Sequence, residues 1–324
     1  MNDRKQLQQV FALALVMVLL AGCGRSPAEP TATRTPVPPT AAPAPVPPTS
    51  TPTPTQTPMP ISHVYAFGDS YSDNGNFKQL APSASWDVWW EGRISNGPIA
   101  VEVFANRLNV ELGDYAVAGA KSDTSNVNPF PNTGALGQVE KFKTELNGHS
   151  ADPNALYFVM IGANDYLEKV SDDLPSDNST LTDHTVDNIV TLITQLAQLG
   201  AKRFLVVNSI DIAIMPLVIT EGRSDHAAEF QTLMNSKLSN RLDELKSQLK
   251  IEITLFDYVT LSTKIRENPS DYGLSNLTDA CQPVFFGVKS ACASPDQYYF
   301  WDESHPTRRV HEIFGEAWAA LFGK

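Results

Sequence analysis

The sequence predicts an α/β fold in which a mostly parallel sheet is covered by helices on both faces. One observation is a set of short, partly β-branched apolar runs, which are typical of buried strands: residues 63–67, 155–161, 204–207 and 251–256. A second observation is that helical patterns alternate with these runs along the chain. Strands that alternate with helices are joined by crossovers, which favours parallel pairing.

Each helical pattern has its own local justification. Pro98 suits the first turn of a helix that is expected to run to about Leu108. Gly200 closes a helix expected over 186–199. The longest helix is expected over 224–249, because apolar residues recur there every three or four positions. Two further helices are expected over 136–146 and 307–321.

The N-terminal segment differs from the rest of the chain. An apolar run over 10–20 follows two basic residues, and it is shorter than the roughly 20 residues that span a membrane. It therefore indicates a secretory signal over 1–22. The sequence LAGC at 20–23 resembles the bacterial lipobox, which implies that Cys23 becomes the lipidated first residue of the mature protein. An ordinary signal peptide or an uncleaved anchor helix is the alternative.

Residues 23–60 are expected to form a disordered stalk. More than half of the chain's 24 prolines lie in this segment, and proline removes backbone donors and favours extended conformations. The remaining residues, 61–324, are enough for one large α/β domain. We therefore expect an exported domain that is held on the bacterial cell envelope by the lipid on Cys23 and faces outward.

Composition limits the partners and the compartment. The formal net charge is −12, so the phosphate backbone of a nucleic acid would be repelled, and nucleic acid is not an expected partner. With Cys23 assigned to the anchor, Cys281 and Cys292 remain, and an oxidising compartment favours a disulfide between them. Two free thiols are the alternative. No Cys/His spacing in the sequence is typical of a metal site.

A candidate nucleophile follows the first predicted strand. Ser70 ends the sequence FGDS, but a serine hydroxyl reacts well only when a histidine takes its proton and an acid orients that histidine. Asp302 stands three residues before His305 near the other end of the chain. Asn164 follows another predicted strand, and ligands of parallel sheets bind beyond the carboxyl ends of the strands. We therefore expect these residues to meet at one edge of the sheet.

Taken together, these segments resemble a known family, the GDSL or SGNH hydrolases. Its four sequence blocks occur here in order: Gly68–Ser70, Gly119 within 115–120, Asn164 within 162–165, and Asp302 with His305. Residues 72–76 and 92–98 are similar to the branch that contains plant GDSL esterases and bacterial phospholipase or haemolysin-like lipases. Tyr71 departs from the pattern, since the family name expects leucine there.

The resemblance implies a three-layer α/β/α, flavodoxin-like fold and the hydrolysis of carboxylic esters without a metal or cofactor. It implies that Ser70 attacks the acyl carbonyl, that His305 moves the proton and that Asp302 orients His305. The implied oxyanion donors are the backbone amides of Ser70 and Gly119 and the side chain of Asn164. The implied partner is a small-molecule or lipid ester.

Several positions carry alternatives. Asp69 and Asp73 are interpreted as turn and capping residues, because short carboxylates bond nearby amides. Gly119 could serve only a tight turn, Asn164 could cap the next helix, and Glu303 could replace Asp302. A salt bridge is expected for Arg93, with a substrate phosphate as its rival. The other histidines are interpreted as structural or surface residues: His63, His149, His184, His226 and His311. An aromatic set could line an acyl pocket or pack in the core: Trp86, Trp89, Trp90, Phe285 and Phe286.

The sequence therefore predicts a surface-anchored serine esterase or lipase. Phospholipase or acyltransferase activity is the first rival, and carbohydrate deacetylation is the second. A binding or adhesion lipoprotein without turnover is the alternative from another class. No G-x-S-x-G sequence occurs, which argues against an ordinary α/β-hydrolase elbow.

Overall fold

A computed structural model describes residues 60–167, 177–284 and 290–324 of the chain. The predicted signal segment, the lipidation site at Cys23 and nearly all of the predicted stalk lie outside the described residues, as do Phe285 and Phe286. None of the helices in the described ranges has the length and apolar character that crossing a membrane requires.

The centre of the fold is a parallel five-stranded sheet with the order β2-β1-β3-β4-β5. Its strands are β1 His63–Gly68, β2 Glu111–Asp114, β3 Leu156–Met160, β4 Arg203–Val207 and β5 Glu252–Phe256. The four predicted strands are confirmed. The edge strand β2 was not predicted, because its sequence, ELGD, is short, polar and only partly buried.

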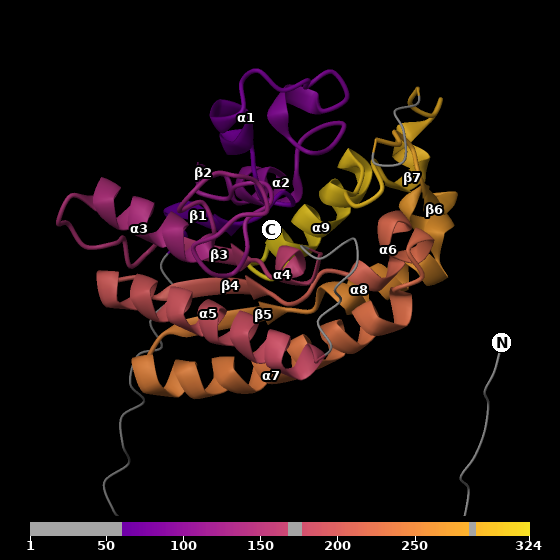
Figure 1. The fold of residues 1–324 in the computed structure, drawn as a ribbon. Coiled ribbons are helices and arrows are strands. Elements are labelled where there is room, and N and C mark those ends of the chain that lie inside the picture. The colour runs from indigo at the N-terminus through magenta and orange to yellow at the C-terminus, as the bar shows by residue number, and fades with distance from the viewer. Residues whose placement is uncertain (1–59, 168–176, 285–289) are drawn as a thin grey trace, which may run out of the picture. The chain divides into compact units, whose positions relative to one another are not determined.

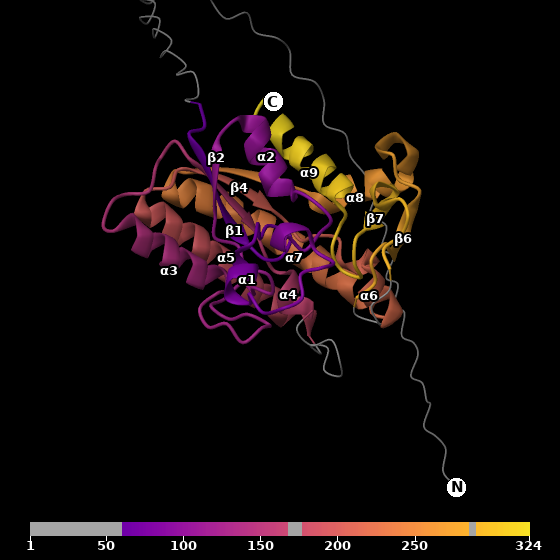
Figure 2. The ribbon, with the colours of Figure 1, turned by 90° about the horizontal axis from the view of Figure 1, so that it is seen from above.

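Helices cover both faces of this sheet, which makes a three-layer α/β/α fold (Figure 1). On one face α2 (Ala100–Leu108) packs against α9 (Arg308–Ala320), and Figure 2 shows the two side by side. On the other face α5 (Asn178–Leu199) packs against α3 (Ala135–Leu146) and α7 (Ser224–Leu249). The predicted fold class is therefore confirmed.

Two helix starts differ from the prediction. Helix α2 begins at Ala100, where the carboxylate of Glu102 accepts the backbone amide of Ile99 and so satisfies one free donor at the start of the helix. Helix α5 begins at Asn178, eight residues before the predicted start, where the side chain of Asp177 caps the amide of Ser179. The first turns of α5 bury threonines rather than aliphatic residues, so the apolar pattern did not reveal them.

Shorter elements complete the described chain. The short helices are α1 Asn76–Leu80, α4 Ala163–Leu167, α6 Pro216–Thr220 and α8 Tyr258–Glu267, and the 3-10 turns are η1 Trp90–Gly92, η2 Ile212–Ile214, η3 Pro269–Tyr272 and η4 Pro295–Gln297. Strands β6 (Asn276–Ala280) and β7 (Tyr298–Phe300) form a separate two-stranded sheet. A disulfide joins Cys281, just after β6, to Cys292.

Candidate active site

The turn that carries Ser70 begins where β1 ends, at Gly68. The backbone carbonyl of Asp69 accepts hydrogen bonds from the amides of Ser72 and Asp73, both at 3.0 Å. The carboxylate of Asp69 accepts from the amide of Tyr71 at 3.1 Å, so the interpretation of Asp69 as a turn residue is confirmed. These bonds fix the backbone on both sides of Ser70 at the carboxyl end of the sheet.

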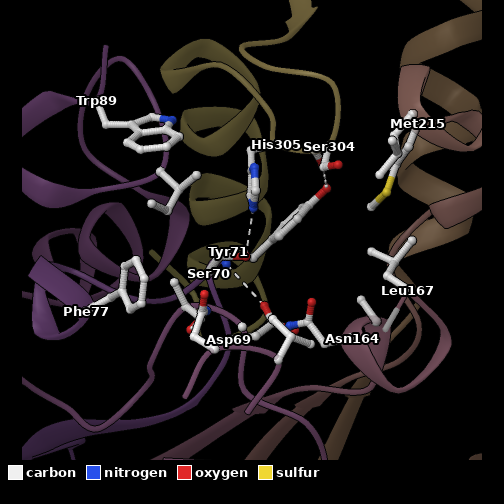
Figure 3. A pocket seen from close by; sticks show the side chains of 17 residues that line it. Asp69, Ser70, Tyr71, Phe77, Trp89, Asn164, Leu167, Met215, Ser304 and His305 are labelled. Carbon is white, nitrogen blue, oxygen red and sulfur yellow. Dashed lines mark hydrogen bonds between the residues drawn. The ribbon is translucent and has the colours of Figure 1, made fainter. Parts of the chain in front are cut away.

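His305 reaches Ser70 from the other end of the chain. Its Nε2 lies 2.8 Å from the Oγ of Ser70 (Figure 3). Its Nδ1 lies 2.8 Å from Oδ1 of Asp302. An ionised carboxylate only accepts hydrogen bonds, so Nδ1 carries the proton and the Nε2 lone pair faces the serine hydroxyl. The structure therefore brings together the three residues that the sequence nominated.

Asp302 is fully buried and receives several donors. Its Oδ1 accepts the backbone amides of Ser304 at 2.9 Å and His305 at 2.8 Å, and its Oδ2 accepts the indole N–H of Trp89 at 3.3 Å. Donors to a carboxylate stabilise its ionised form and fix its orientation. Glu303 points elsewhere, since its carboxylate accepts the backbone amide of Val284.

Gly119, on the loop after β2, and Asn164, in helix α4 after β3, line the same pocket as Ser70. Neither the amide of Ser70 nor that of Gly119 donates a hydrogen bond to another described residue. Gly119 has a φ of +80°, and an added Cβ would collide with Asn126. The side chain of Asn164 donates to the carbonyl of Ala120 at 3.0 Å. Asn164 lies inside α4, so the proposed capping role is wrong.

Asp73 connects the Ser70 turn to the Gly119 loop. Its Oδ1 accepts the amide of Asn76 at 2.6 Å, and its Oδ2 accepts the amides of Phe77 at 3.0 Å and Ala118 at 2.7 Å. The predicted capping role of Asp73 is confirmed. The bond to Ala118 also holds the peptide next to Gly119, which the sequence did not indicate because the two positions are 45 residues apart.

A pocket of about 340 Å³ opens over Ser70 and His305. Figure 3 shows Trp89 and Phe77 on one side of it and Met215 and Leu167 on the other. Further apolar side chains complete the wall: Ile94, Val127 and Leu217. Its volume lies within the usual range for small-molecule sites, and its wall is suited to an apolar group.

Burial changes the proton affinity of Asp69, the carboxyl group next to Ser70. Asp69 is 3% exposed, and burial raises its pKa to about 7, against the opposing effects of the Tyr71 amide and of His305. Burial also lowers the pKa of His311 to about 3, and its Nδ1 accepts the amide of Ala100 at 3.2 Å. His311 is therefore a neutral core residue, as predicted.

The remaining candidates lie away from the reacting atoms. None of the other histidines, all of which fall in the described ranges, bonds Ser70. Arg93 pairs with Glu102 at 2.5 Å, which confirms the expected salt bridge. Trp86 packs against Phe77 and Trp89, whereas Trp90 is 38% exposed.

Sequence reasoning missed three contributors to the site. Gln138, on α3, bonds both backbone groups of Gly68 at the end of β1. Trp89 was considered only as a pocket or core residue, and its bond to Asp302 was not foreseen. Tyr71 was noted only as a departure from a pattern. These contacts join segments that are far apart in the sequence, so the spacing of nearby residues could not predict them.

Comparison with known proteins shows the family of this chain. The family described as GDSL-like Lipase/Acylhydrolase matches residues 64–318 of the chain. The chain belongs to this family. It is therefore a serine ester hydrolase.

Individual relatives of this GDSL hydrolase are distant. The thermolabile hemolysin of Vibrio parahaemolyticus is 27% identical over 280 residues, which cover 80% of this chain and 63% of the hemolysin, so the match spans less than two thirds of that protein. A GDSL esterase/lipase of Arabidopsis thaliana is 24% identical over 310 residues, which cover 78% of this chain and 80% of the plant protein. A solved lipolytic G-D-S-L protein from Veillonella parvula shares 16% identity with a TM-score of 0.43, over 80% of this chain and 97% of that one.

Proposed function

We propose that this GDSL hydrolase cleaves carboxylic esters of apolar acyl groups through a Ser70–His305–Asp302 triad and an acyl-enzyme. The observation that carries the proposal is the continuous hydrogen-bonded chain from Asp302 through His305 to Ser70, at the floor of an apolar pocket. A serine hydroxyl held in this way has both the base and the orienting acid that it needs.

In the first half of the reaction, Ser70 Oγ attacks the acyl carbonyl while its proton passes to Nε2 of His305. The imidazolium that forms is stabilised by the carboxylate of Asp302. The tetrahedral intermediate collapses when His305 returns the proton to the leaving alcohol, which leaves the acyl group on Ser70. In the second half a water gives a proton to the same Nε2 and attacks the acyl carbonyl. His305 then passes this proton to the departing Oγ of Ser70, which releases the acid and restores the free serine.

Negative charge develops on the carbonyl oxygen during both halves. We propose that the backbone amides of Ser70 and Gly119 and the side chain of Asn164 donate to it, because both amides have no acceptor among the described residues. The loss of one such donor typically costs about 3 to 4 kcal/mol of barrier. The bond from Asp73 to the Ala118 amide supports this role, because it fixes the loop that carries Gly119.

The apolar wall favours an acyl chain over an acetyl group on a carbohydrate. Phe77, Trp89 and Met215 surround the space beyond the Ser70 hydroxyl. A chain that fills this space gains about 0.8 kcal/mol for each methylene that it buries. Turnover of p-nitrophenyl esters from acetyl to dodecanoyl, alongside a phospholipid, tests this preference. A strict preference for acetyl esters would refute it.

The catalytic assignment is tested by two serine variants. Ser70→Ala is expected to abolish ester turnover and labelling by a fluorophosphonate probe without loss of the folded state. Ser72→Ala is the matched control, because it removes a fully buried hydroxyl that bonds no other described residue. It is expected to retain turnover. Folded wild-type protein that is neither labelled nor active would refute the proposal.

We also propose that Cys23 is lipidated and anchors the exported protein to the cell envelope, with the LAGC sequence at 20–23 as support. Metabolic labelling with palmitate and membrane fractionation, in a bacterial host, test this. Wild-type protein is expected to carry label and to sediment with membranes, and Cys23→Ser to do neither. Equal labelling of the two proteins would contradict the anchor.

A further inference from the structure

The side chain of Tyr71 links the turn that carries Ser70 to the loop that carries His305. Its hydroxyl donates to the backbone carbonyl of Ser304 at 2.6 Å, across 233 residues of sequence. Ser304 immediately precedes His305, and Tyr71 immediately follows Ser70. Figure 3 shows the phenol crossing the site toward Ser304, next to the bond between His305 and Ser70. The Ser70 turn and the His305 loop are therefore joined by two hydrogen bonds: the one between Ser70 and His305, and the one from Tyr71 to Ser304.

The surroundings hold this phenol in one place. Tyr71 is 6% exposed, and its ring centroid lies 5.6 Å from that of His305 and 6.5 Å from that of Tyr258. Its backbone amide is fixed by Asp69, and Ser304 is fixed by its bond to Asp302. Burial raises the pKa of the Tyr71 hydroxyl well above its ordinary value, so it remains a donor in any practical ester assay.

These two hydrogen bonds differ in how long they persist during the proposed reaction. The bond from Ser70 to Nε2 of His305 needs the serine proton, and that proton is gone once Ser70 is acylated. His305 must nevertheless stay in place to activate the incoming water. The bond from Tyr71 to Ser304 loses no proton at any stage, so it is still present in the acyl-enzyme.

We propose that Tyr71 is a positioning residue, whose hydroxyl keeps the His305 loop in register with the Ser70 turn throughout the catalytic cycle. The inference rests on the proposed function, since it concerns the geometry of that same reaction. It assigns a task to the position where this chain has tyrosine in place of the leucine of the family name.

The experiment compares Tyr71→Phe with Tyr157→Phe in the full chain. Tyr157 is also fully buried, and its hydroxyl also donates to a backbone carbonyl, that of Asp152 at 3.0 Å. It lies on β3, outside the pocket lining. Each variant therefore loses one buried phenol-to-carbonyl bond and keeps its ring. Titration with a fluorophosphonate counts the active sites, so that turnover is expressed per folded molecule.

Tyr71→Phe is expected to lower kcat for a p-nitrophenyl ester about tenfold without a rise in KM, because a small misplacement of a catalytic group is costly while the ring still lines the pocket. Pre-steady-state kinetics should show that deacylation is slowed at least as much as acylation. Tyr157→Phe is expected to keep the wild-type kcat, although both variants melt at a lower temperature.

The outcomes separate the inference from the proposed function. Wild-type turnover per site in Tyr71→Phe, or an equal loss in Tyr157→Phe, would overturn the positioning role alone. A rise in KM without a fall in kcat would overturn it too. Wild-type protein that hydrolyses no ester would overturn the proposed function and this inference with it.

Discussion

The side chain of Gln138 pairs with both backbone groups of Gly68, two residues before Ser70. Its Oε1 accepts the Gly68 amide at 2.9 Å, and its Nε2 donates to the Gly68 carbonyl at 2.8 Å. Gln138 is 2% exposed, and its Nε2 also donates to the carbonyl of Thr133 at 3.0 Å. One helix residue thus takes the place of a neighbouring strand where β1 ends, and so fixes the start of the turn that carries Ser70.

Gln138→Glu should therefore damage both stability and turnover. The carboxylate keeps an acceptor for the Gly68 amide, but it loses both donors and faces the carbonyl oxygens of Gly68 and Thr133. A buried group that loses its partner costs about 1 to 3 kcal/mol, although the Gly68 carbonyl still accepts the amide of Val117 at 3.2 Å. Urea unfolding and ester turnover are the measurements. Glu140→Gln, at an exposed position of the same helix, is the control and should change neither stability nor turnover. A Gln138→Glu protein with wild-type stability and turnover would contradict the role of Gln138 in fixing the end of β1.

Asp302 and Glu303 can be separated as the orienting acid. Asp302→Asn is expected to lower kcat by about 10³- to 10⁴-fold, because a neutral amide no longer selects the His305 tautomer with its lone pair on Nε2. Glu303→Gln keeps an oxygen acceptor for the Val284 amide and should keep the wild-type kcat. Steady-state kinetics on both variants decide the question. The reverse ranking of the two losses would assign the role to Glu303.

Ser70, Asp302 and His305 could be predicted because the sequence next to each of them has a recognisable pattern. Ser70, Asp302 and His305 stand in short, polar segments that follow apolar runs, and the parallel pairing of the strands places loops at one edge of the sheet. The contacts of Gln138 and Tyr71 could not be predicted in this way. Their partners are backbone atoms 70 and 233 residues away, so only the folded chain identifies them.

The fold shows the same division. Strands and helices with strong apolar periodicity were predicted nearly to the residue, as for α7, whose bounds Ser224–Leu249 agree with the expectation. The strand β2 and the first eight residues of α5 were missed. In both, polar residues take the buried or edge positions, and tertiary contacts decide the structure.

The raised pKa of Asp69 predicts how its contribution to stability changes with pH. Its carboxyl has a pKa of about 7 in the folded protein, against about 3.9 for an unfolded chain. Between these values the folded state holds a proton that the unfolded state releases. The contribution of Asp69 is therefore fully present below about pH 4 and is lost as the pH rises to about 7.

Asp69→Asn removes this titration. The free energy of unfolding of the variant, minus that of the wild type, is expected to increase by a few kcal/mol between about pH 4 and pH 7, since each pKa unit corresponds to about 1.4 kcal/mol. Urea unfolding of both proteins at several pH values measures the difference. A constant offset from the substitution itself does not affect this comparison, and a difference that is flat across the range would refute the prediction.

The disulfide between Cys281 and Cys292 should stabilise the segment that leads to Asp302. The backbone amide of Cys281 donates to the carbonyl of Phe300 at 3.1 Å, and that of Gln282 donates to the carbonyl of Trp301 at 2.6 Å, directly before Asp302. Closing a loop with a sequence separation of 11 residues restricts the unfolded chain, which raises the free energy of unfolding by about 2 to 3 kcal/mol in the chain-entropy description.

The double variant Cys281→Ser/Cys292→Ser should lose about this much free energy of unfolding, and reduction of the wild type should lower its stability equally. The reductant should leave the double variant unchanged, which separates this bond from any effect at Cys23. If intact mass after alkylation finds two reactive thiols at these positions in the unreduced native protein, the disulfide is absent and the prediction is wrong.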